Sequence, residues 1–178
     1  MTWVARIVAI HRSLRAASGP QAFGGALALA WCTQRARGTI DIDLNLFVGL
    51  DEVDRALDGL PDGVAVSTED QTLLRRDGQA RLWWDQTPVD VFFNTTGFHA
   101  EVAGRARVEA FAGQDVPFLA CRDLAVFKAF FDRTKDWADL EEMAAAGTLD
   151  VPVVIGELAV RLGGDDPRIE RLRALANE

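Results

Sequence analysis

The sequence predicts an α/β (α+β) fold, a mixed β-sheet flanked by helices with a helical C-terminal part. Strand-like and helix-like hydrophobic patterns alternate as far as about residue 120, and only helix-like patterns follow. A length of 178 residues suits one domain. We therefore expect a core over residues 1–120 and a C-terminal helical segment over residues 121–178 that packs on it in a single compact unit.

The first elements are read from hydrophobic spacing and from glycine and proline breaks. Apolar residues at helical spacing predict a helix over 3–15, and a Ser-Gly-Pro break ends it. A short strand then leads into the turn Gly24-Gly25, and an unbroken run of helix formers predicts a buried helix over 26–35. The segment 40–46 alternates strictly between apolar and polar residues, which predicts a strand with one buried face.

The middle of the chain continues the mixed pattern. Residues 51–60 predict a helix, and a Pro-Asp-Gly turn leads into an expected strand over 64–67. A further turn is expected over 75–78. Two strands over 81–84 and 88–93 follow, and Pro88 stands at a strand start, where its missing N–H donor costs least.

The last third of the chain is predicted to be helical after one more pair of short strands. The strand pair is expected over 105–111 and 116–119. Asp166 is expected to cap the final helix, whose first residue is a proline. The expected helices cover residues 123–131, 136–146, 151–162 and 167–175.

Composition limits the possible functions. Hydrophobic residues make up 49% of the chain and charged residues 26%, which excludes a disordered chain. The net charge of -8 argues against a surface that attracts nucleic acid everywhere, because non-specific binding grows with the number of cations presented to the phosphates. A local basic groove remains compatible with this charge.

The sequence also indicates a location. No apolar stretch approaches the roughly 20 residues that a membrane span needs, and the N-terminus lacks the basic region and apolar run of a secretory signal. Cys32 and Cys121 each stand alone in an apolar segment, so we expect buried thiols in a reducing compartment and neither a disulfide nor metal ligands. We therefore expect a cytoplasmic protein without a membrane partner.

The strand over 40–46 carries the most informative residues. Its alternation places Asp41 and Asp43 on one polar face, although aspartate is depleted in strands. The pair is either the solvated face of an antiparallel sheet or a pair of oxygen ligands for Mg²⁺ ions that bridge a triphosphate. Asp90 lies on a later strand, and three carboxylates on neighbouring strands would repel one another unless cations neutralised them.

The turn Gly24-Gly25 adds an anion-binding element, because the first amides of a helix have no intrahelical partners. With Asp41, Asp43 and Asp90 following in this order, the sequence resembles the nucleotidyltransferase superfamily, which includes DNA polymerase beta and the aminoglycoside nucleotidyltransferases. The resemblance covers about the first 95 residues. It implies a nucleotidyltransferase-like fold for the sheet and helices of the core.

The segment from Asp123 to Leu140 narrows the resemblance. It looks like the helix, lysine and charged segment of the AbiEii-type nucleotidyltransferases, which are toxins of toxin–antitoxin systems. The resemblance implies metal-dependent catalysis with Mg²⁺ or Mn²⁺ and a nucleoside triphosphate (NTP) as substrate. The implied roles are nucleotide binding by Gly24, Gly25, Thr39 and Lys128, metal binding by Asp41, Asp43 and Asp90, and catalysis by these three aspartates with Lys128 and Asp136.

Two of these assignments have simpler alternatives. Lys128 lies on an apolar helix face and could merely extend its ammonium group to solvent. Asp136 and Asp139 could belong to a solvated helix start, with an i,i+4 pair between Lys135 and Asp139.

The expected function is transfer of a nucleoside monophosphate from an NTP to an acceptor hydroxyl, an activity of the EC 2.7.7 type. The resemblance implies the 3′ end of tRNA as acceptor, and hence a growth-inhibiting toxin with a cognate antitoxin protein. Transfer to a small hydroxyl compound or a protein side chain, and an inactive module that binds a nucleotide or a partner, remain as alternatives. An RNA acceptor would require these arginines to gather on one face: Arg12, Arg15, Arg35, Arg37, Arg75, Arg76, Arg105 and Arg107.

Overall fold

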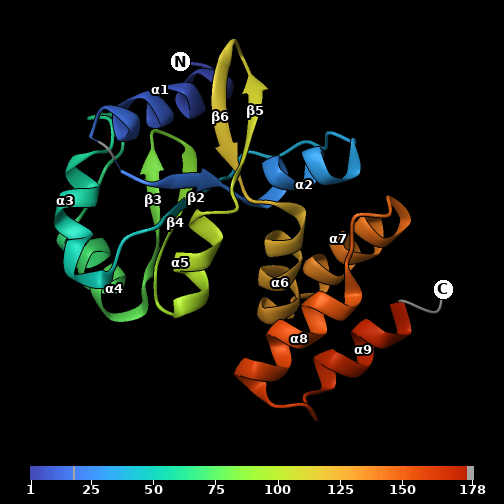
Figure 1. Ribbon diagram of the computed structural model, residues 1–178. Coiled ribbons are helices and arrows are strands. Elements are labelled where there is room, and N and C mark those ends of the chain that lie inside the picture. Colours follow the sequence, from blue (N-terminus) through green and yellow to red (C-terminus); the bar gives the residue numbers. More distant parts are fainter. Residues whose placement is uncertain (18, 176–178) are drawn as a thin grey trace. The chain divides into compact units, whose positions relative to one another are not determined.

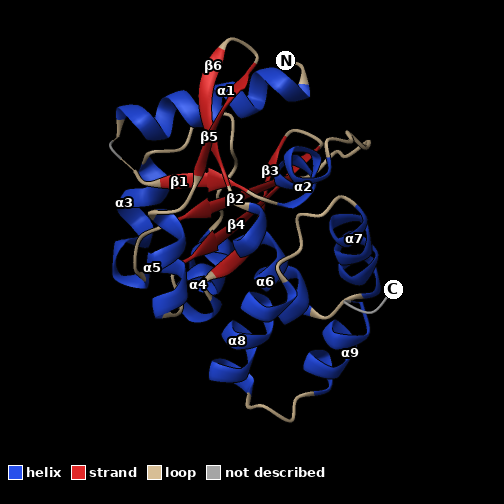
Figure 2. Cartoon of the chain, turned by 45° about the vertical axis from the view of Figure 1, so that its right-hand side comes forward, coloured by secondary structure: helices blue, strands red, loops and turns tan. Residues whose placement is uncertain are grey.

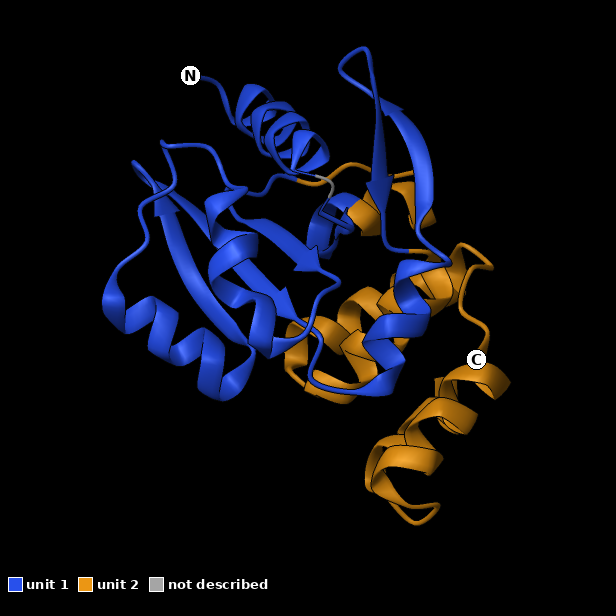
Figure 3. Ribbon diagram, turned by 60° about the vertical axis from the view of Figure 1, so that its left-hand side comes forward, with its two compact units in different colours: residues 1–27, 38–119 blue, residues 28–37, 120–178 orange. Residues whose placement is uncertain are grey.

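The computed structural model describes residues 1–17 and 19–175 (Figure 1). The chain divides into two compact units, which are described separately below (Figure 3). Unit 1 comprises residues 1–27 and 38–119, and unit 2 comprises residues 28–37 and 120–178. Within the described residues, no helix combines the length and the apolar character needed to cross a membrane.

A mixed β-sheet forms the centre of unit 1 (Figure 2). The strands are β1 (Gln21–Phe23), β2 (Ile42–Leu46), β3 (Gln79–Trp84), β4 (Thr87–Phe93), β5 (Arg107–Phe111) and β6 (Gln114–Phe118). Their order in the sheet is β3-β4-β2-β1-β6-β5. The neighbours β2 and β4 run parallel, as do β1 and β6, whereas β1–β2 and the hairpins β3–β4 and β5–β6 are antiparallel.

Helices complete the core of unit 1. They are α1 (Trp3–Ala16), the start of α2 (Gly25–Thr33), the 3₁₀ turn η1 (Leu50–Glu52), α3 (Val53–Asp58), α4 (Thr68–Asp77) and α5 (Gly97–Ala103). Helix α1 buries Ile7, Ile10 and Leu14, as its apolar spacing predicts, and it contacts β6. Strand residues such as Leu44 and Val91 are fully buried and supply the sheet's part of the core.

Strand β2 is shorter and more covered than its sequence pattern predicts. It begins at Ile42, so Ile40 lies outside it and is 69% exposed, which is opposite to the expectation for an apolar position. Leu44, Asn45 and Leu46 are all buried, so the strand is covered on both faces where one buried face was expected. β2 is a central strand with β1 and β4 along its edges, and elements packed on both sides of the sheet cover its two faces.

The region 64–78 differs from the sequence-based expectation. Of the expected strand over 64–67, only Ala65 pairs, in an isolated bridge to Trp83. Ser67 instead caps α4 and forms a reciprocal capping box with Asp70. The expected turn over 75–78 is the end of this helix and its left-handed cap at Gly78, whose φ is 70°. Helix α5 was not expected either.

Unit 2 is helical, and the expected helices are present. They are α6 (Cys121–Phe131), α7 (Thr134–Ala145), α8 (Val151–Leu162) and α9 (Pro167–Leu175). Their buried faces meet around Trp137, Leu158 and Leu172, each of which is at most 1% exposed. Asp150 accepts a hydrogen bond from the Val153 amide at 3.2 Å and so caps α8.

The expectation of two separate buried thiols is wrong in this structure. Cys32 near the end of α2 and Cys121 at the start of α6 form a disulfide, and their Cα atoms are 5.5 Å apart. Both cysteines belong to unit 2. Because the two positions are 89 residues apart in the sequence, spacing alone indicated no pairing. The bridge closes a long loop, which is the case in which a cross-link restricts the unfolded chain most.

Reduction of this disulfide should lower stability. We expect Cys32→Ser, or a reducing agent on the unchanged chain, to lower the free energy of unfolding by about 2–5 kcal/mol, because the unfolded chain regains the entropy of a long loop. Denaturant unfolding with and without reductant measures the difference. Thiol titration of the unfolded, unreduced chain is the control, and two free thiols would contradict the bridge.

Candidate functional site

The glycine turn between β1 and α2 lies directly on Asp43. Gly25 has a φ of +52°, and a Cβ atom built there would lie 1.8 Å from Asp43 Oδ2. The Gly24 amide donates a hydrogen bond to the Asp43 carbonyl oxygen at 2.9 Å. Any side chain at position 25 would therefore be strained by the backbone and would collide with the carboxylate. The turn and Asp43 form one structural unit.

The carboxylates expected on neighbouring strands are neighbours in the sheet. Parallel pairing of β2 with β4 places Asp43 beside Asp90, and antiparallel pairing of β3 with β4 places Arg81 on the other side of Asp90. Residues paired in this way share a face of the sheet. Asp41 lies two residues before Asp43, just ahead of the strand. A row of charged residues thus crosses three adjacent strands of unit 1.

Arg81 neutralises part of this row. Its Nε donates to Asp90 Oδ1 at 2.7 Å and its Nη2 to Asp90 Oδ2 at 2.8 Å, a two-pronged arrangement. The same Nη2 lies 3.7 Å from Asp41 Oδ2. Hydrogen bonding to Asp90 and the charges of Asp41 and Asp43 raise the pKa of Arg81 further above its ordinary value. One guanidinium therefore serves two of the three carboxylates.

Asp41, Asp43 and Asp90 supply oxygen ligands of the kind that a divalent metal site requires. Carboxylate oxygens are the ligands that Mg²⁺ and Mn²⁺ prefer, and Asp41 and Asp90 already share one cation, the guanidinium of Arg81. Within residues 1–17 and 19–175, however, no group of three or more histidine, cysteine, aspartate or glutamate side chains is arranged to hold a metal ion. The donor chemistry fits a metal, and Arg81 holds both oxygens of Asp90 in this structure.

Thr39 holds the backbone of Asp41. Its hydroxyl oxygen accepts a hydrogen bond from the Asp41 amide at 3.2 Å, and its Oγ1 lies 3.4 Å from the Asp41 carbonyl oxygen. This local pairing is typical of threonine in turns. The hydroxyl expected to bind nucleotide therefore fixes the entry into β2 in this structure.

Lys128 and Asp136 belong to unit 2, in a buried ionic cluster. Lys128 is 6% exposed, and its Nζ donates a hydrogen bond to Asp139 Oδ2 and lies 3.7 Å from Asp136 Oδ1. Each carboxylate has a second cation: Arg133 donates to Asp136 at 2.6 and 3.2 Å, and Arg37 donates to Asp139. Two aspartates therefore share three cations in a largely desolvated place.

This cluster overturns the two simpler alternatives for these residues. Lys128 does not extend its ammonium group to solvent, since Asp139 binds it inside the unit. Asp136 and Asp139 are each 1% exposed, so they are not a solvated helix start. Sequence reasoning missed the role of Asp139, although its place one turn after Asp136 on α7 puts both on the same helix face.

Arg81 is the other site residue that sequence reasoning missed. The pattern predicted both strands of the β3–β4 hairpin, and its two-residue turn pairs Trp84 with Thr87. Counting back along both strands from that pair places Arg81 opposite Asp90. The hairpin register therefore contained the signal, although the residue type alone did not.

Several arginines expected to bind RNA already have acidic partners. Arg75 pairs with Asp54, Arg105 with Glu101 and Arg107 with Glu109 in unit 1. Arg76 pairs with Asp77, also in unit 1. In unit 2, Arg37 pairs with Asp139. Such pairing reduces the positive charge that these side chains offer to a phosphate backbone.

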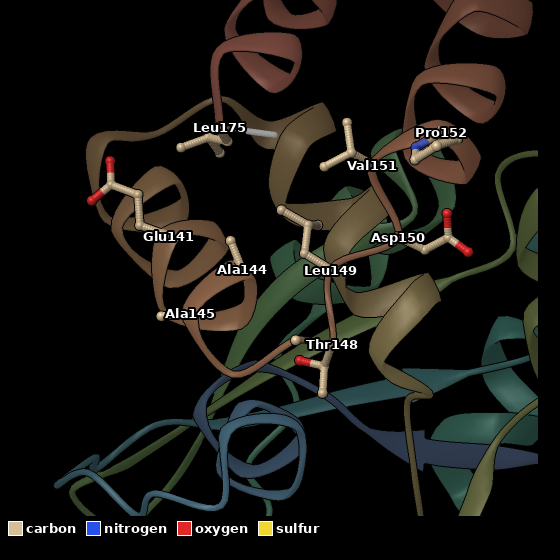
Figure 4. A pocket seen from close by; sticks show the side chains of 10 residues that line it. Glu141, Ala144, Ala145, Thr148, Leu149, Asp150, Val151, Pro152 and Leu175 are labelled. Carbon is tan, nitrogen blue, oxygen red and sulfur yellow. The ribbon is translucent and has the colours of Figure 1, made fainter. Parts of the chain in front are cut away.

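Two cavities, one in each unit, lie away from the predicted site residues. In unit 2, a cavity of about 920 Å³ lies between the end of α7, the start of α8 and Leu175 (Figure 4). Two acidic residues, Glu141 and Asp150, line it, and Asp150 already caps α8. In unit 1, a cavity of about 320 Å³ lies between α1, the end of β2 and α3. Neither is lined by a residue of the carboxylate row or of the Lys128 cluster.

The contact between Gly25 and Asp43 predicts that substitutions at these two positions have strongly coupled effects on the free energy of unfolding. Gly25→Ala should lower the free energy of unfolding by more than the roughly 1–2 kcal/mol of a left-handed alanine, because the new methyl group collides with the carboxylate. In an Asp43→Ala background the same change should cost less, since the colliding atoms are gone. Denaturant unfolding of the four chains gives the coupling energy. Gly113→Ala, at a position with a φ of +76° and open space around it, is the matched control.

The buried cluster predicts that Lys128 is needed for stability. Lys128→Met should lower the free energy of unfolding by about 3–5 kcal/mol, because Asp136 and Asp139 lose a buried cation. Lys135→Met, at the exposed lysine of α7, should stay within about 0.5 kcal/mol of the parent chain. Thermal or denaturant unfolding measures both. An unchanged stability of Lys128→Met would mean that the ammonium is not structural.

Comparison with known proteins concerns the fold. No family model and no curated protein matches the sequence. Among solved structures, the crystal structure of ANT(2'')-Ia in complex with adenylyl-2''-tobramycin matches with a TM-score of 0.57 and 16% identity, over 99% of this chain and 98% of that one. The solution structure of the same antibiotic-resistance factor gives a TM-score of 0.55 and 14% identity, over 98% and 90% of the two chains.

A third structure extends the comparison beyond that factor. An antigenic nucleotidyltransferase-like protein from Paracoccidioides brasiliensis matches with a TM-score of 0.52 and 10% identity, over 97% of this chain and 85% of that one. At these identities the likeness concerns the arrangement of helices and strands. The chain therefore has the α/β fold of the nucleotidyltransferases, a mixed sheet flanked by helices with a helical C-terminal part.

Proposed function

We propose that the chain is a nucleotidyltransferase, which moves a nucleoside monophosphate from an NTP to an acceptor hydroxyl, as enzymes of the EC 2.7.7 kind do. The observation that carries the proposal is the contact between the Gly24-Gly25 turn and Asp43, on a fold that solved nucleotidyltransferases share. This contact brings the start of a helix next to a carboxylate on the sheet. A triphosphate with its cation needs both kinds of group side by side.

Each group in unit 1 has a proposed task. Asp41, Asp43 and Asp90 would hold Mg²⁺ or Mn²⁺, which when bound would lower the pKa of the acceptor hydroxyl and offset the charge of the pyrophosphate leaving group. The Gly24-Gly25 turn would present the first N–H groups of α2 to phosphate oxygens, while the Gly24 N–H itself donates to the Asp43 carbonyl oxygen. The missing side chain at Gly25 leaves room for the Asp43 carboxylate against the turn.

Thr39, Lys128 and Asp136 have narrower proposed roles. Thr39 would keep Asp41 in position through the backbone hydrogen bond that it already forms. The ammonium group of Lys128 has three donors; one bonds Asp139, and Asp136 Oδ1 lies 3.7 Å away. A phosphate oxygen of the triphosphate would accept another. Asp136 would then act by holding Lys128 in position.

The acceptor favoured by fold and charge is a small hydroxyl compound. The solved structure that covers 99% of this chain holds adenylyl-2''-tobramycin, an adenylylated small molecule. The net charge of -8 suits a cationic acceptor better than a polyanion. The arginines that an RNA would need are largely paired with carboxylates.

The 3′ end of tRNA is the second candidate acceptor. It rests on the resemblance of α6 and the start of α7, with Lys128 and Asp136, to the AbiEii-type toxins. In that case the chain would be a cytoplasmic toxin with an antitoxin partner. The disulfide between Cys32 and Cys121 would then have to persist in a reducing compartment, where such bridges are rare.

A labelled-nucleotide assay tests the proposal and separates the acceptors. The chain is incubated with each labelled NTP, Mg²⁺ or Mn²⁺, and either total RNA or a set of polyhydroxyl amines. Label should enter one acceptor class and pyrophosphate should be released. No transfer to any acceptor, combined with retained NTP binding, would instead indicate an inactive nucleotide-binding module.

Substitution of the carboxylates gives the sharpest prediction. Asp41→Asn and Asp43→Asn should each lower the turnover number by about a hundredfold or more, as removal of one group that stabilises transition-state charge typically does. Their stability should be unchanged or higher, because like-charge repulsion falls. Asp54→Asn, at an exposed aspartate paired with Arg75, is the matched control and should keep full activity. Near-normal turnover of Asp43→Asn would exclude the metal assignment.

A further inference from the structure

Arg81 occupies the place among the carboxylates where a cation is needed. Both oxygens of Asp90 accept hydrogen bonds from its guanidinium, and Asp41 Oδ2 lies 3.7 Å from its Nη2. A carboxylate whose two oxygens already bind a guanidinium is a poor ligand for a metal ion, because the metal must first replace those bonds. The same guanidinium that stabilises the row therefore obstructs one end of it.

The surroundings of Arg81 allow it to leave. Its strand, β3, is at the edge of the sheet, and the side chain is 49% exposed, whereas Asp90 is 20% exposed. The guanidinium therefore has solvent to move into, while Asp90 stays in the sheet beside Asp43. Asp43 itself is held on the other side by the glycine turn. The arginine is thus the movable partner, and Asp90 and Asp43 are the fixed ones.

We propose that Arg81 is an internal competitor of the divalent cation, and that the metal completes its ligand set only when the guanidinium leaves Asp90 and Asp41. The inference rests on the proposed function, because it concerns the metal of that same site. It accounts for a guanidinium that binds both oxygens of one carboxylate of the row and lies close to a second. The metal-free site is stabilised by Arg81, and metal binding is weakened by the same contacts.

Metal binding without turnover tests the inference. Mn²⁺ is titrated into the full chain, and free Mn²⁺ is measured by electron paramagnetic resonance. Arg81→Gln should bind Mn²⁺ about tenfold more tightly than the parent chain, since loss of a partly exposed, charge-assisted pair is worth roughly that factor. Arg81→Lys should lie between the two, because an ammonium cannot occupy both oxygens of Asp90 at once. Arg75→Ala, which breaks an exposed Arg–Asp pair elsewhere in unit 1, should match the parent chain.

A measurement on the unchanged chain removes any dependence on how the variants fold. Addition of Mg²⁺ should speed the exchange of the Arg81 Nε–H with water, because its bond to Asp90 Oδ1 is released. Slow exchange that persists at saturating Mg²⁺ would contradict the inference.

The outcomes separate this inference from the proposed function. If the parent chain binds Mn²⁺, Asp43→Asn abolishes that binding, and Arg81→Gln binds no more tightly, Arg81 is not a competitor although the metal site stands. If neither the parent chain nor any Arg81 variant binds Mn²⁺, the metal site fails and the inference fails with it. Tighter binding by Arg81→Gln and Arg81→Lys, in that order, supports both.

Discussion

Repulsion between carboxylates is the constraint around which the site of unit 1 is arranged. Asp41, Asp43 and Asp90 lie on or beside two neighbouring strands, so their charges oppose one another at short range. Two features offset this repulsion within the chain. The start of α2 presents its backbone to Asp43, where the helix dipole favours a negative charge, and Arg81 binds Asp90. Each feature depends on one residue: the approach of α2 depends on Gly25, and the ion pair depends on Arg81.

Unit 2 meets a similar constraint with burial. Asp136 and Asp139 are almost fully buried, so their charges could not persist without close cations, and Lys128, Arg133 and Arg37 provide them. The arginines are about half exposed, while the lysine is inside. Of the three cations, Lys128, which lies between the two carboxylates, therefore has the least contact with water.

Sequence patterns predicted those parts of the structure that depend on local spacing. The four helices of unit 2, helix α1 and the hairpin β3–β4 follow hydrophobic periodicity, and Asp166, the expected cap of α9, accepts a hydrogen bond from the Arg168 amide. Helix α4 was missed because its evidence is a capping box, Ser67 with Asp70, on a strongly polar helix whose one buried residue is Leu74. The disulfide was missed because it joins positions 89 residues apart.

The residues of the candidate site also fall into those that local sequence patterns predict and those that they do not. The three aspartates and the glycine turn could be named from alternation and motif order, because each lies within one element. The partners Arg81 and Asp139 depend on strand register and on burial, which residue types do not reveal. Ile40 shows the reverse error: alternation extended the strand two residues too far, and the structure leaves this side chain exposed.

The strand order also implies an order of folding. The hairpin β3–β4 joins residues that are close in sequence, so it can form within microseconds and bring Arg81 to Asp90 early. The parallel pairing of β2 with β4 joins distant segments and must wait for the closure of a much longer loop. Asp90 therefore meets the second strand with its charge already compensated. The arginine would thus lower the barrier to docking two acidic strands, a kinetic contribution that precedes any ligand.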